Sequence, residues 1–71
     1  MKEETVRISL NGEPKKIPEG LSVLKLIESL GLNEKSIAVG RNKNVIPRSE
    51  HSTTTVRSGD QIDIVHFVQG G

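Results

Sequence analysis

The sequence predicts an α+β domain, with a mixed sheet of four to five strands and one main helix packed on one face. Residues 5–10 and 61–68 alternate apolar and polar side chains, as half-buried strands do. Residues 21–32 instead carry apolar side chains at helical spacing. The elements follow the order strand, strand, helix, strand, short strand, strand, which is typical of two packed layers. Because a crossover helix follows the first two strands, we expect the first and last strands to lie side by side at the sheet centre.

The length and composition of the chain fit one small domain with an aliphatic core. Its 71 residues include one Phe and no Trp, Tyr or Cys, which excludes disulfides and thiolate metal sites. The net charge is only +1 and lacks the basic cluster of a nucleic-acid-binding protein. No apolar run is long enough to span a membrane, and the charged N-terminal segment is unlike a signal peptide. We therefore expect a cytoplasmic protein that binds neither nucleic acid nor a membrane.

The sequence also lacks the usual motifs of enzymes and metal sites. It has no catalytic-triad order, no His-x-x-x-His pair, no P-loop and no dinucleotide-binding glycine motif. We therefore expect the chain not to be an enzyme in its own right. The two histidines have no convergent partners as metal ligands, so we expect His51 at the surface and His66 at the edge of the core.

The first two strands are predicted to form a hairpin. Asn11–Gly12 supplies the positive φ angles of a tight turn after residues 5–10. The returning segment, residues 13–20, contains Pro14 and Pro18, which remove donors from the ladder. This segment is therefore expected to be an edge strand.

The helix is predicted over residues 21–32. Ser22 can cap its first turn, and Gly31 suits the left-handed residue just past its end. The helix is too short to be stable alone in water, so it must pack on the sheet. Its buried stripe is expected to comprise Val23, Leu26, Ile27 and Leu30.

The segments after the helix are expected to be short strands. Residues 36–41 read as a strand interrupted at Gly40, which suggests a bulge or a close backbone approach. Residues 42–44 read as a turn, and residues 45–47 as a very short strand that ends at Pro47. Three basic residues around this turn could attract an acidic partner or form an ordinary solvated loop; they are Arg41, Lys43 and Arg48.

In the last strand, Ile62 and Ile64 are expected to face the core. Alternation then directs Val65 and Phe67 outward. Since alternation weakens near a chain end, a buried Phe67 remains the alternative. Two outward apolar side chains are more typical of a partner surface than of an isolated sheet face.

The sequence ends in Gly70–Gly71, and we expect residues 1–67 to form the domain and residues 68–71 a flexible tail. Such a tail reaches about 13 Å when extended, at about 3.3 Å per residue. Glycine has no Cβ, so the tail can enter a narrow slot and leave its last carbonyl unhindered. A carboxylate at that point becomes reactive once adenylated, and a sulfur nucleophile or an amine can then attack it. The alternative is a frayed end or a cloning remnant.

The sequence resembles the sulfur carrier proteins of thiamin thiazole biosynthesis, the ThiS family of the ubiquitin-like β-grasp superfamily. The matching stretches span nearly the whole chain in order. They are LNGE (10–13), GLSVLKLIESLGL (20–32), IAV (37–39), N-x-x-VIPRS (42–49) and SGDQIDIVHFVQGG (58–71). The terminal Gly-Gly is shared across the superfamily, whereas the combination of IPRS, GDQIDIV and VQGG is more specific to this branch. The chain departs from the family pattern at Gly40–Arg41 and at His51, where an aromatic residue is common.

The resemblance implies a sequence of reactions at Gly71. Its carboxylate would be adenylated by an activating enzyme that uses ATP and Mg²⁺, and the carrier itself would bind no cofactor. Sulfur relayed from a cysteine desulfurase would convert the adenylate to a thiocarboxylate, which would donate sulfur to thiazole synthase. The last strand and tail would dock these partners, through Val65, Phe67, Val68, Gln69 and Gly70. We expect the free carrier to be a monomer.

Three alternatives stay open at this point. The carrier could serve molybdopterin synthesis or tRNA thiolation instead of thiazole synthesis. The chain could be a ubiquitin-like modifier joined to lysines through Gly71. It could also be a plain interaction domain with no terminal chemistry.

Overall fold

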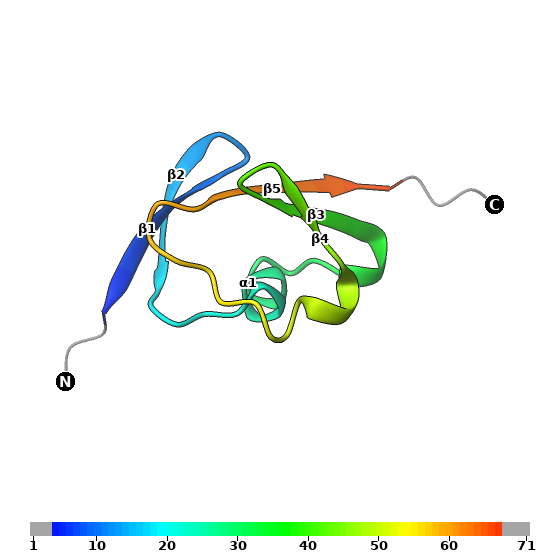
Figure 1. The fold of residues 1–71 in the computed structure, drawn as a ribbon, viewed down its shortest axis with the longest axis horizontal. Helices are drawn as coiled ribbons and strands as arrows, with labels where there is room; N and C mark the ends of the chain where they lie inside the picture. The colour runs from blue at the N-terminus through cyan, green and yellow to red at the C-terminus, as the bar shows by residue number, and fades with distance from the viewer. Residues whose placement is uncertain (1–3, 68–71) are drawn as a thin grey trace.

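In the computed structural model, which describes residues 4–67, a mixed sheet of five strands packs against one α-helix (Figure 1). The sheet order is β2-β1-β5-β3-β4. β1 and β5 are parallel neighbours, and the other adjacent pairs are antiparallel. The α+β prediction and the central pairing of the first and last strands are confirmed. The elements are β1 (Thr5–Leu10), β2 (Glu13–Pro18), α1 (Val23–Ser29), the 3₁₀ turn η1 (Glu34–Ser36), β3 (Ile37–Arg41), β4 (Asn44–Ile46), the 3₁₀ turn η2 (Arg48–Glu50) and β5 (Gln61–His66).

The core between the helix and the sheet is aliphatic, as the composition predicts. It takes residues from α1, from all five strands and from the long connection that precedes β5. Val56, in that connection, is buried although no strand or helix pattern surrounds it. The buried apolar residues are Ile8, Ile17, Val23, Leu26, Ile27, Ile37, Val39, Ile46, Val56, Ile62 and Ile64.

The predicted local signals at the first hairpin and at the helix are confirmed. Asn11 and Gly12 have φ angles of 51° and 84°, and β2 lies at the sheet edge. Ser22 Oγ accepts a hydrogen bond of 3.1 Å from the backbone N–H of Lys25, which caps the first turn of α1. Gly31 has a φ of 75°, as expected after the helix end. The helix is shorter than the predicted residues 21–32, because both flanking turns lie outside it.

The predicted interruption at Gly40 is wrong. The ladder is continuous there, since Gly40 pairs with Val45 on one side and with Asp63 on the other. A Cβ at this position would meet only ordinary contacts, the nearest at 3.8 Å from the Asn44 carbonyl oxygen. Glycine at this position therefore marks neither a bulge nor a close approach.

A turn between β3 and β4 is present as predicted, but it is one residue shorter than the predicted residues 42–44, because Asn44 already belongs to β4. Asn42 and Lys43 both adopt positive φ angles, of 52° and 72°. This is the geometry of a two-residue hairpin turn, which Asn tolerates and Lys does not favour.

The predicted position of each histidine is wrong. His51 is only 2% exposed. Its Nδ1 lies 2.8 Å from Glu34 Oε2, and its Nε2 lies 3.2 Å from the Ile46 carbonyl oxygen. These two partners offset the cost of burying a polar ring. His66 lies on β5 but is exposed rather than at the core edge.

Candidate functional site

The end of β5 presents apolar side chains on the face of the sheet away from the helix. Ile62 and Ile64 are buried, whereas Val65 and Phe67 are 61% and 51% exposed. The predicted alternation is therefore confirmed, and a buried Phe67 is excluded.

Two neighbouring strands extend this apolar surface. Ala38 on β3 is the cross-strand partner of Val65. Val45 on β4, 77% exposed, pairs with Gly40, which in turn pairs with Asp63 on the outer face of β5. These four residues, Ala38, Val45, Val65 and Phe67, form what we call the outer patch. Val45 could not be assigned from the sequence, because β4 has only three residues and shows no clear alternation.

Beside the outer patch, the last part of β5 is fixed by hydrogen bonds that its backbone N–H groups donate. The backbone N–H of Phe67 donates to the Ser36 carbonyl at 2.9 Å, just before β3. On the other edge, the N–H of Ile64 donates to Asn11 Oδ1 at 2.8 Å. The chain is thus held in the sheet up to Phe67.

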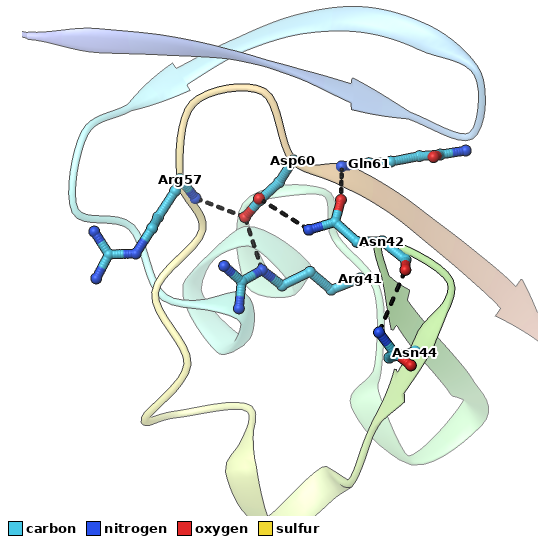
Figure 2. Close-up of polar contacts among 6 residues, drawn as sticks. All are labelled: Arg41, Asn42, Asn44, Arg57, Asp60 and Gln61. Atoms are coloured by element: carbon cyan, nitrogen blue, oxygen red, sulfur yellow. Dashed lines mark hydrogen bonds and ion pairs between the residues drawn. The ribbon is translucent and has the colours of Figure 1, made fainter.

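The start of β5 is anchored by a polar cluster around Asp60 (Figure 2). Asp60 Oδ2 accepts hydrogen bonds of 2.8 Å from Arg41 Nε and from the Arg57 backbone N–H. Asn42 donates to Asp60 Oδ1 at 3.3 Å and accepts from the Gln61 backbone N–H at 2.9 Å. The cluster ties the β3–β4 turn to the connection and the strand that lead to the outer patch.

The pKa of the Asp60 carboxyl lies below its ordinary value. Burial acts in the opposite direction and disfavours the charged form. Burial is outweighed by the combined effect of the hydrogen bonds from the Arg57 backbone, Arg41 and Asn42 and of the positive charge of Arg41, all of which lower the pKa. Asp60 is therefore ionised in the folded protein. Arg41 forms its ion pair with Asp60, within the domain, rather than with an acidic partner.

The remaining predicted site residues lie outside the described residues. They are Val68, Gln69, Gly70 and Gly71. Within residues 4–67, no group of three or more His, Asp or Glu side chains could hold a metal ion. No helix in this part of the chain has the length and apolar character needed to cross a bilayer.

Several known proteins resemble this chain. The sequence model of the ThiS family matches residues 8–71. The sulfur carrier protein ThiS of Thermus thermophilus is 34% identical over 62 residues, which cover 87% of this chain and 95% of that protein. A thiazole synthase of Magnetococcus marinus is 38% identical over 66 residues, which cover 93% of this chain and 20% of that protein. The chain thus spans about a fifth of the length of this longer relative.

A solved structure agrees with these sequence matches. The crystal structure of the thiamine biosynthesis protein ThiS from Geobacter metallireducens superposes with a TM-score of 0.81 at 29% sequence identity. The match covers 93% of this chain and all of that one. The five-stranded mixed sheet with one helix is thus the β-grasp fold of these proteins. On the family match and the near-complete alignment with a curated carrier, the chain belongs to the ThiS family.

Proposed function

We propose that this protein is a sulfur carrier of thiamin biosynthesis and that the carboxylate of Gly71 is the group that carries sulfur. The observation behind the proposal is that the family match runs from residue 8 through Gly70–Gly71. The curated carriers of Thermus thermophilus and Escherichia coli align with this chain over 95% and 100% of their own lengths.

The chemistry proceeds by activation and substitution. ATP transfers AMP to the Gly71 carboxylate with release of pyrophosphate, and the carboxylate becomes an acyl-adenylate. The terminal sulfur of a persulfide attacks the carbonyl carbon and AMP leaves, which gives an acyl disulfide. A thiol then attacks the persulfide-derived cysteine sulfur of that disulfide, so that a new disulfide forms and the thiocarboxylate is released. Two successive glycines suit this chemistry, because no Cβ hinders approach to the carbonyl.

In this scheme the chain is a co-substrate rather than a catalyst. The activating enzyme supplies the site for ATP and Mg²⁺, and a cysteine desulfurase supplies sulfur indirectly. The carrier contributes a fixed base, β5, and a tail that enters the active sites of other proteins.

The outer patch is the proposed docking surface for these partners. It lies beside the point where the tail leaves the sheet, and it exposes three large apolar side chains. Phe67 is the expected anchor, since aromatic residues are over-represented among binding hot spots. Val65 contributes apolar area next to it.

We further propose that thiazole synthase is the acceptor of the sulfur. Two curated relatives named thiazole synthase, from Magnetococcus marinus and Paramagnetospirillum magneticum, each contain a segment similar to nearly the whole of this chain. A carrier-like segment and a synthase in one polypeptide favour a shared reaction.

Intact-mass spectrometry tests the proposal. The purified chain is incubated with its activating enzyme, ATP, Mg²⁺, a cysteine desulfurase and cysteine. We expect the mass of the chain to increase by the difference between one sulfur and one oxygen atom. A variant that lacks Gly71 should show no such increase.

Two results would contradict it. An unchanged mass with all components active would contradict the carrier function, and conjugates of this chain with lysines of other proteins in lysate would favour a protein modifier.

The pathway is assigned by adding acceptor enzymes to the charged carrier. The added sulfur mass should be lost with thiazole synthase, and it should persist with a molybdopterin or tRNA-thiolation acceptor.

A further inference from the structure

A second surface feature shares Ala38, Val45 and Phe67 with the outer patch and extends beyond it to the two 3₁₀ turns. It is a pocket of about 430 Å³ between η1, the start of β3, the end of β4, η2 and Phe67. We call it the end pocket. Figure 1 shows that these elements gather at the same end of the molecule as the end of β5. A protein that encloses the tail therefore passes close to this pocket.

The lining of the end pocket favours an apolar occupant. The apolar surface comes from Ala38, Val45, Ile46, Pro47 and Phe67. Within residues 4–67, no buried side-chain nitrogen or oxygen is left without a hydrogen-bond partner. The pocket thus offers no unsatisfied buried group to orient a polar small molecule. An apolar side chain of another protein fits this lining better.

The rim of the pocket selects for negative charge beside that apolar side chain. Lys35 on η1 and Arg48 on η2 both line the pocket and are exposed. Neither forms an ion pair with the residues that the structure describes. The one acid at the rim, Glu34, is bonded to His51. Two free cations at the mouth of an apolar pocket complement a carboxylate on the partner.

The pocket is built before any partner binds. The buried ring of His51 contacts Glu34 on η1 and the Ile46 carbonyl on β4, so it joins two walls of the pocket. The His51 backbone carbonyl also accepts a bond of 2.9 Å from the N–H of Leu24, which fixes the residue against α1. A preformed pocket loses less entropy on binding than one that must order.

We propose that the end pocket receives an apolar side chain of thiazole synthase that is flanked by an Asp or Glu, which pairs with Lys35 and Arg48. The inference rests on the proposed function and adds a contact that selects the acceptor enzyme. Both partners would contact the apolar residues that the outer patch and the end pocket share, and the cationic rim of Lys35 and Arg48 would distinguish the synthase from the activating enzyme.

The test compares two doubly charge-reversed variants. In K35E/R48E the rim of the end pocket becomes acidic. In R7E/K16E the same change in net charge is made at two exposed, directly paired positions of the β1–β2 hairpin, away from the pocket. Affinity for thiazole synthase is measured by calorimetry at low and high salt, and the rate of charging by the activating enzyme is measured by mass.

We expect K35E/R48E to weaken synthase binding by about 10-fold at low salt, with a smaller effect at high salt. R7E/K16E should bind within about two-fold of the wild type, and both variants should be charged within about two-fold of the wild-type rate. Synthase binding by K35E/R48E equal to that of R7E/K16E would overturn the inference. An equal loss in charging would also overturn it, since the pocket would not select the synthase.

Failure of the proposed function gives a different result. In that case the wild type is not charged or does not bind the synthase, and the end-pocket inference fails with it. If V65S loses binding while K35E/R48E keeps it, the outer patch is supported and only the end pocket is overturned. Val65 does not line the pocket, which makes this comparison possible.

A cross-linking experiment tests the chemistry of the occupant. The chain contains no cysteine, so K35C can carry a single photo-reactive label at the rim. In the complex with thiazole synthase, the label should capture a synthase peptide in which an apolar residue adjoins Asp or Glu. Capture of a basic peptide, or no capture beyond that of K16C, would contradict the proposal.

Discussion

The two ends of β5 differ in the polarity and burial of their side chains and in the role that these side chains have. Just before its start, Asp60 is buried and accepts hydrogen bonds from Arg41, Asn42 and the Arg57 backbone. At its end, Val65 and Phe67 are apolar and exposed. The usual distribution, with polar groups outside and apolar groups inside, is reversed at both ends of one strand. The difference indicates that the start of the strand stabilises the fold, whereas its end is available to other proteins.

The largest expected effect comes from D60A, at the anchored end. The substitution removes the acceptor of three hydrogen bonds and leaves Arg41 without its partner, so we expect a loss of about 3 kcal/mol in the free energy of unfolding. Chemical denaturation measures it. D63A, on the outer face of the same strand, should cost about 0.5 kcal/mol or less. Equal losses in the two variants would remove the distinction between anchor and surface.

At the exposed end, F67A should affect binding and not stability. Truncation of a hot-spot aromatic costs about 2 kcal/mol, so the Kd for the activating enzyme should rise roughly 30-fold. The free energy of unfolding should stay within about 0.5 kcal/mol of the wild type. A decrease in the free energy of unfolding that exceeds the decrease in binding free energy would show that Phe67 mainly stabilises the fold.

A smaller effect is expected in the turn that adjoins the Asp60 cluster. Lys43 has a φ of 72°, where a side chain is strained and glycine is not. K43G should therefore raise the free energy of unfolding by about 0.5–1 kcal/mol, after allowance for the greater freedom of glycine in the unfolded chain. K35G, at a position without positive φ, is the control and should not stabilise the protein.

The smallest effect is a dependence on acid. The pKa of Asp60 is lowered in the folded protein, so the ionised carboxylate stabilises the fold at pH values above the ordinary Asp range. That stabilisation is lost as the pH falls below about 4, through the ordinary pKa of Asp and then through the folded one. The free energy of unfolding of the wild type should fall more steeply in this range than that of D60N. Parallel slopes would show that Asp60 is not preferentially ionised in the folded state.

Much of the fold could be predicted because its signals are local. Asn11–Gly12 defines the first turn, Ser22 and Gly31 bound the helix, and the alternation of β5 places Phe67 outside. Each of these features depends on residues within a few positions of one another. Local backbone preference and side-chain alternation were sufficient to predict them.

The missed features depend on residues far apart in the sequence. Glu34 and His51 are separated by 17 positions and lie in segments without periodicity, so nothing in the sequence paired them. Arg41 and Asp60 are separated by 19 positions, and the sequence suggested a solvated loop for Arg41 instead. Gly40 was misread because glycine weakens a strand on average, while here both neighbouring strands pair with it.

The place of β5 in the sheet has a consequence for synthesis. The β1–β2 and β3–β4 hairpins share no edge, and only the strand that leaves the ribosome after both of them joins them into one sheet. A nascent chain that stops short of this strand holds two hairpins with nothing between them, and the core residues Ile62 and Ile64 are missing. Long-range closure of this kind is slow and occurs late. We therefore expect a chain truncated before β5 to leave the core faces of both hairpins exposed, because the strand that completes the core is also the one that leads to Gly70–Gly71.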